Sequence, residues 1–96
     1  MPYIKKDRRT VLDPYIDELL YNLWGHSDEV DDISPELGEI NYIVSKILWH
    51  CWEYRKNYGR AAMLIGTVNC AIEEFRRRVL NPYEDDKIQI EGDIFE

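Results

Sequence analysis

The longest helical pattern in the sequence covers residues 34–58, SPELGEINYIVSKILWHCWEYRKNY. Ser34 is a favourable N-cap, and Pro35 suits the first helical position, where its missing N–H would have no partner inside the helix. Gly59 follows the pattern, and glycine is the residue that most often ends a helix. We therefore predict one long helix from Ser34 to about Tyr58.

Two different faces of this helix are apolar. At about 100° per residue, one face forms a continuous stripe that we expect to point into the core. The other face repeats every three or four residues, which is the spacing of a seam between packed helices. The first face comprises Leu37, Ile40, Val44, Ile47, Leu48, Cys51, Tyr54 and Tyr58. The second comprises Tyr42, Ser45, Trp49, Trp52 and Lys56 and is called the aromatic seam below.

The aromatic seam needs a cover, because large aromatic side chains carry about 150–250 Å² each and the other face already supplies the core. We predict a homo-oligomer in which two copies of the helix pack through Tyr42, Trp49 and Trp52. The alternative is a platform on which a flat heterocycle such as a nucleobase stacks. The subunit interface and the ligand platform coincide if a pocket forms between subunits. Packing against the amino-terminal segment is a further alternative.

Two other helices complete the expected fold. The first opens with Asp13 as N-cap and Pro14 at the first helical position, continues as an apolar helical pattern and ends at Gly25. The third covers about residues 61–80 and ends before Pro82. We predict an all-α, small three-helix bundle with long antiparallel second and third helices and a shorter first helix. Its single domain would span residues 1–96.

Both ends of the chain are expected to lie outside the bundle. Residues 1–12 form a basic N-terminal arm, in which a short extra turn near residues 7–12 is expected, and residues 82–96 form an acidic, irregular tail. In the arm, Tyr3, Lys6 and Arg9 are candidates for binding a phosphate group, since arginine and lysine both suit one. The alternative is an exposed arm that only offsets the acidic remainder.

The net charge of −7 repels the phosphate backbone, so we expect no nucleic-acid binding. No apolar run approaches the roughly 20 residues of a membrane span, and no signal peptide is recognisable, so we expect no membrane association and a cytoplasmic location.

Catalytic and metal-binding patterns are weak. The closest is a set of acids that could hold magnesium for nucleotide hydrolysis, but Arg76 stands where a further acid would be needed. These acids are also explained as helix-start charges or partners of Arg76–Arg78. They are Glu36, Glu39, Glu73 and Glu74. His50 and Cys51 are adjacent on a helix and diverge by about 100°, so they form no dyad. We expect no enzyme, catalytic residue, metal or cofactor.

Three blocks of sequence resemble a known family. They are MPYIKKDR at residues 1–8, GEINYI at residues 38–43, and EFRRRV followed by NPYED at residues 74–85. The chain resembles an uncharacterised family of small helical prokaryotic and phage proteins with an M-P-Y-I start, a G-E-L-N-Y block and a P-Y-E-D close. The resemblance implies a compact helical fold in which Asn41, Tyr42 and Tyr83 are polar core or interface residues.

By size and helical character, the chain is also similar to phage sponge proteins, which assemble as small oligomers and sequester nucleotide signals of bacterial immunity. The leading hypothesis is therefore a non-enzymatic oligomer with an anti-defence role. Its nucleotide-like ligand would be bound between subunits by Asn41, Tyr42, Trp49, Trp52 and the basic arm. The alternative is a structural or regulatory protein-interaction module.

Overall fold

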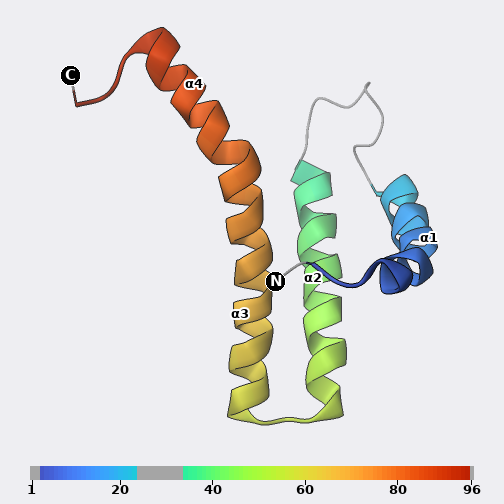
Figure 1. Ribbon diagram of the computed structural model, residues 1–96. Helices are drawn as coiled ribbons and strands as arrows, with labels where there is room; N and C mark the ends of the chain where they lie inside the picture. The colour runs from blue at the N-terminus through green and yellow to red at the C-terminus, as the bar shows by residue number, and fades with distance from the viewer. Residues whose placement is uncertain (1–2, 24–33, 96) are drawn as a thin grey trace. The chain divides into compact units, whose positions relative to one another are not determined.

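The computed structural model describes residues 3–23 and 34–95, and for residues 34 and 35 only the backbone. Every element in these ranges is helical and no strand occurs in them, which confirms the predicted all-α class (Figure 1). The helices are α1 (Lys6–Asn22), α2 (Ser34–Tyr54), α3 (Tyr58–Phe75), the π-helical segment η1 (Arg76–Leu80) and α4 (Asn81–Glu91). Three predictions lie outside what the structure describes: the helix end at Gly25, the connection at residues 26–33 and the side-chain cap at Ser34.

Helix α1 begins seven residues before the predicted N-cap, so the interpretation of Asp13 as the start of the helix is wrong. The carbonyl oxygen of Lys5 accepts the backbone N–H groups of Arg8 and Arg9 at 3.1 Å each. Asp7 lies in the first turn, where the helix dipole favours a negative charge. Pro14 lies inside α1, where it supplies no backbone N–H to the hydrogen bonds of the helix. Most of the predicted N-terminal arm is therefore the first half of a helix.

Helix α2 ends at Tyr54, and residues 55–57 form a non-helical connection before α3 begins. The Oδ1 atom of Asn57 accepts the backbone N–H of Arg60 at 2.8 Å, which is the geometry of an N-cap three residues before its partner. Gly59 thus lies in the first turn of α3. The expectation that Gly59 ends the second helix is wrong. The side-chain cap at Asn57 sets the boundary.

The chain continues as a helix beyond Asn81, although Asn81-Pro82 was expected to end it (Figure 1). Pro82 has no N–H, and in an α-helix its ring would clash with the carbonyl group four residues earlier, that of Arg78. Segment η1 widens the turn at this point, and the N–H of Asn81 bonds to the carbonyl oxygen of Arg76, five residues back. Residues 81–91 therefore form α4, where the sequence indicated an irregular tail.

The described part of the chain divides into two compact units, residues 3–60 and residues 61–95. The predicted single domain and the antiparallel pairing of the second and third helices both concern the relation between these units and stay predictions. Within the described ranges, no helix combines the length and apolar character needed to cross a membrane.

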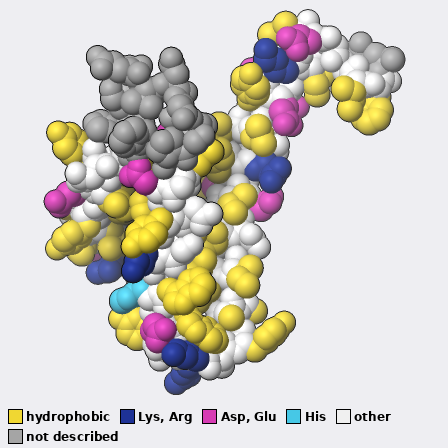
Figure 2. All heavy atoms as spheres, turned by 180° about the vertical axis from the view of Figure 1, so that it is seen from behind, with side chains coloured by type: hydrophobic (Ala, Val, Ile, Leu, Met, Phe, Trp, Pro, Cys, Tyr) yellow, Lys and Arg dark blue, Asp and Glu magenta, His cyan; other side chains and the backbone are white. Residues whose placement is uncertain are grey.

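No described side chain is fully buried. On α2, the predicted core stripe is covered only in part, since Val44, Leu48 and Cys51 are half-buried while Tyr54 is 73% exposed. Apolar side chains also reach the surface across the visible face in the space-filling view, scattered among acidic and basic ones (Figure 2). The fold leaves much apolar surface in contact with solvent.

Candidate binding surface

The four seam residues from Tyr42 to Trp52 lie along α2, whereas Lys56 follows the end of this helix, and the seam presents large rings to solvent. Tyr42 is 63% exposed and Trp49 is 65% exposed, whereas Trp52 and Ser45 are half-buried. At 1.5 Å per residue, Tyr42 and Trp52 are separated by about 15 Å along the helix axis. Continuous helical geometry from Ser34 to Tyr54 keeps these residues on one side of the helix. The predicted seam is therefore a long surface.

Polar neighbours fix the first turn of the aromatic seam. The Ser45 hydroxyl donates to Oδ1 of Asn41 at 3.2 Å, one turn earlier on the same helix. The Nζ atom of Lys46 lies 5.6 Å from the centre of the Tyr42 ring, within the range of a cation–π contact. Asn41 is exposed and bonded to its own helix. The structure thus places a cation beside Tyr42, whereas Asn41 lies about 100° further round the helix and bonds to Ser45.

An open groove of about 480 Å³ adjoins Tyr42. It lies between the end of α1 and the beginning of α2, within the unit of residues 3–60. Its lining is mainly apolar, with an amide and a carboxylate as polar groups. The lining residues are Leu19, Asn22, Leu23, Gly38, Glu39, Tyr42 and Ile43.

The sequence analysis missed this groove, because it joins residues about twenty positions apart. One local signal was present, namely a glycine inside a helical pattern one turn before Tyr42. Glycine is unfavourable inside a helix, so its presence indicates a need for space or for a close approach. A methyl group placed on Gly38 would meet no atom within 4 Å, so the absent side chain leaves the groove open at this point.

The basic residues of the N-terminal segment gather on the first turn of α1. Lys6 and Arg9 are three residues apart, which places them on the same side of the helix. The Nε atom of Arg9 donates to the carbonyl oxygen of Ile4 at 2.9 Å, and Tyr3 is exposed just before the helix. At 1.5 Å per residue, Lys6 and Leu19 of the groove are about 20 Å apart along α1. The basic turn and the groove thus lie at opposite ends of α1.

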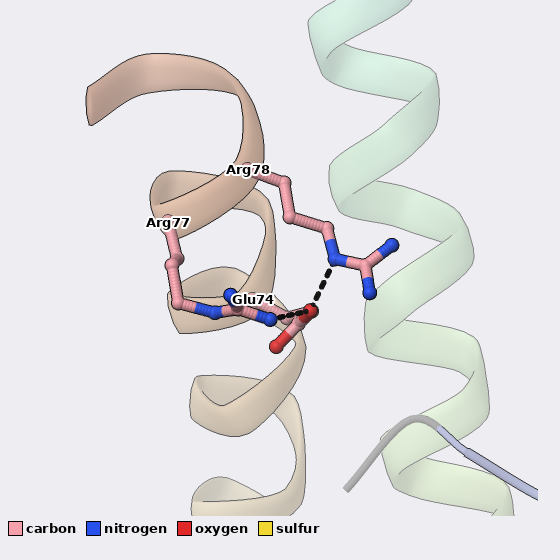
Figure 3. Close-up of polar contacts among 3 residues, drawn as sticks. All are labelled: Glu74, Arg77 and Arg78. Carbon is pink, nitrogen blue, oxygen red and sulfur yellow. Dashed lines mark hydrogen bonds and ion pairs between the residues drawn. The ribbon is translucent and has the colours of Figure 1, made fainter. Parts of the chain in front are cut away.

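The acids considered as magnesium ligands are divided between the two units. Glu73 pairs with Nε of Arg76 at 3.8 Å, and Glu74 pairs with Arg77 and Arg78, which confirms the predicted partners of these two acids (Figure 3). Among the residues that the structure describes, no three His, Cys, Asp or Glu side chains are grouped so that they could hold a metal ion.

His50 and Cys51 make contacts with different partners. The His50 ring packs edge-on against Tyr54, with ring centres 5.2 Å apart and planes at 90°. The Cys51 carbonyl oxygen accepts a hydrogen bond from Nε of Arg60 at 2.8 Å, so this part of α2 holds the start of α3.

A family model described as "Domain of unknown function (DUF6899)" matches residues 1–94, so the chain belongs to this family. The match covers all three sequence blocks on which the resemblance to an uncharacterised family rested. No curated protein matches the chain significantly, and neither does any solved structure.

Proposed function

We propose that this member of the family is a non-enzymatic binding protein that works as a homo-oligomer. The aromatic seam on α2 forms the interface between subunits, and a small, flat, anionic ligand of the nucleotide type binds where subunits meet. The exposure of Tyr42 and Trp49 on one face of α2 is the observation that carries the proposal.

The exposed apolar surface favours self-association. A chain with no fully buried described side chain gains free energy by covering that surface, at about 25 cal/mol for each Å² removed from water. Tyrosine and tryptophan are enriched at protein interfaces, where they contribute large apolar areas and a polar group. A surface about 15 Å long is also better matched to a helix than to one small molecule.

The nucleotide part of the proposal rests on two complementary groups. Aromatic rings stack on the flat faces of bases, and this contact is independent of base identity. Lys6 and Arg9 lie at the N-terminal end of α1, where the helix dipole also favours an anion. Because the basic turn and the groove are about 20 Å apart on α1, a mononucleotide that uses both must contact two subunits.

A second candidate function is a protein-interaction module without a small ligand. Glu39 supports it, because a carboxylate in the wall of the groove repels the phosphate of a nucleotide. In this alternative, the groove and the aromatic seam accept apolar side chains of a protein.

Native mass spectrometry of the purified chain, with and without a panel of linear and cyclic nucleotides, tests the proposal. We expect a discrete oligomer and an added nucleotide mass for each site. Trp49→Ala should dissociate the oligomer, whereas Tyr54→Ala, which removes an exposed ring from another face of α2, should leave it intact.

The other outcomes separate the candidates. A seam-dependent oligomer that binds no nucleotide would contradict the ligand and favour the interaction module. A monomeric wild-type protein would contradict self-association itself. Lys6→Ala with Arg9→Ala should abolish nucleotide binding while leaving the oligomer unchanged, which separates the ligand site from the interface.

A further inference from the structure

We infer that the groove between α1 and α2 docks a basic segment of a partner protein. A large apolar side chain of that segment fills the groove, and its lysine or arginine side chains lie against the acidic groups beside the groove. The inference specifies the partner in the second candidate function. It holds whether or not the chain also self-associates, because the groove and the aromatic seam share only Tyr42.

The stretch of chain that contains all groove residues is acidic. From residue 10 to residue 45, the sequence has no lysine and no arginine. The acids of this stretch whose side chains the structure describes are Asp13, Asp17, Glu18, Glu36 and Glu39. Such a surface attracts a positively charged partner and repels an acidic one, because complementary charge steers association and like charge opposes it.

Glutamates belong to both helices that form the groove. Glu39 is part of the groove wall, and Glu36 lies three residues before it, on the same side of α2. Both are half-buried. On α1, Glu18 precedes the groove residue Asn22 by one turn. Because partly buried charges are less screened by water, Glu36 and Glu39 attract a neighbouring cation more strongly than fully exposed carboxylates do.

The end of α1 adds to the negative potential of the groove. Leu19, Asn22 and Leu23 line it, and the C-terminal end of a helix carries a partial negative charge that favours cations. The last turn of α1 contains no basic residue, so a lysine or arginine of the partner would supply the favourable charge. Nδ2 of Asn22 donates to the Glu18 carbonyl oxygen at 2.8 Å, which leaves Oδ1 as the acceptor that this amide offers to the partner.

The open form of the groove favours a protein segment over a small molecule. Sites for small molecules usually enclose about 70–90% of the ligand surface, whereas here Leu19 is 43% exposed and Tyr42 is 63% exposed. A protein segment can place one large side chain in the space beside Gly38 and continue beyond both ends of the groove. Lys46, which lies 5.6 Å from the Tyr42 ring centre, repels cations, so the basic residues of the segment would lie toward Glu36.

Titration with designed peptides, followed by the backbone amide signals in NMR, tests the inference. The probe is a short lysine-rich peptide with one central tryptophan, and its control has alanine in place of the tryptophan. We expect the probe to shift the signals of Leu19, Gly38 and Ile43 and to bind about tenfold or more tightly than the control, because a buried aromatic anchor dominates such contacts. Equal affinities of the two peptides, or no shift at these residues with millimolar probe, would overturn the docking site.

Two matched pairs of variants separate the space from the charge. Gly38→Leu places a side chain in the groove and should weaken probe binding about tenfold or more, whereas Gly66→Leu, at a helical glycine that also has no atom within 4 Å of an added methyl group, should not. Glu39→Gln should weaken binding about threefold or more, and Glu73→Gln, in the other unit, should leave it unchanged. A groove variant that binds as tightly as its control would contradict the corresponding contact.

These results are distinguishable from a failure of the proposed function. A monomeric chain that binds the basic probe would contradict self-association and support the docking site. An oligomer that carries a nucleotide but does not bind the probe would overturn only the docking site. A glutamate-rich peptide with the same tryptophan should not bind, and equal binding of this peptide would overturn the basic character of the partner. Far-ultraviolet circular dichroism confirms for every variant that its helices are retained.

Discussion

Glu74 forms ion pairs with two arginines, Arg77 and Arg78. One carboxylate oxygen accepts Nη2 of Arg77 at 2.7 Å and Nε of Arg78 at 2.6 Å, and only 22% of the side chain is exposed (Figure 3). Partial burial strengthens such pairs relative to exposed ones. Because both arginines belong to η1, Glu74 ties the π-helical segment to the last turn of α3.

We expect Glu74→Gln to lower the free energy of unfolding by about 1 kcal/mol, since the neutral amide loses the charge-assisted part of both contacts. Urea unfolding followed by circular dichroism measures the change. Glu73→Gln is the matched control, because its contact with Arg76 is 3.8 Å long and exposed, and it should change stability by less than about 0.5 kcal/mol. Equal effects of the two substitutions would contradict the special position of Glu74.

At the scale of the elements, side-chain caps and backbone partners place the helix ends. Asn57 bonds to the N–H of Arg60 and begins α3, although Gly59 would be expected to end a helix here. Likewise, the π turn of η1 carries the chain past Pro82. Both cases show that a helix-breaking residue is tolerated where a neighbouring group satisfies the backbone.

Asn57→Ala should destabilise the protein by about 1 kcal/mol, because the first turn of α3 loses its N-cap. Asn57→Asp keeps an acceptor oxygen at the same place and should retain the stability of the wild type. Thermal unfolding of the three proteins at equal concentration provides the comparison. An alanine variant as stable as the aspartate variant would show that this cap contributes nothing.

Pro82→Ala tests the reason for the π turn. Alanine restores the N–H and removes the clash with the carbonyl group of Arg78, so we expect η1 to relax to α-helical geometry and the hydrogen bond from Asn81 to Arg76 to be lost. Carbon-13 chemical shifts and amide hydrogen bonds measured by NMR over residues 76–82 report this change. Persistence of the π turn in the variant would mean that Glu74, and not Pro82, maintains it.

At the scale of the whole molecule, the exposure of the described apolar side chains connects stability with assembly. No described side chain is fully buried, and the aromatic seam and the groove leave apolar groups in water. Small domains have little stability to spare, so association that covers such surface adds directly to the free energy of unfolding. Folding and assembly are then expected to be coupled.

This coupling predicts a Tm that rises with protein concentration, because mass action favours the folded oligomer. Differential scanning calorimetry over a hundredfold range of concentration should show a steady increase for the wild type. The increase should be absent in Trp49→Ala, which is expected to be monomeric. A wild-type Tm that is independent of concentration would contradict coupled assembly.

The sequence by itself determined the helical class, the presence of a long helix from Ser34 and the alignment of Tyr42, Trp49 and Trp52, because these follow from a periodicity that one helix displays locally. It also indicated the ion pairs of Glu73 and Glu74, whose partners lie three or four residues away. Self-association and ligand binding remain predictions.

The true helix ends became visible only in the hydrogen bonds of the structure, and only the tertiary structure decided the groove. Single residues such as Asp13, Gly59 and Pro82 carry local preferences, but the hydrogen bonds of Lys5, Asn57 and Asn81 outweigh them. The groove joins α1 to α2 and therefore depends on how two distant segments approach each other. Periodicity specifies which residues share a face of one helix, whereas the packing of one helix against another specifies what that face contacts.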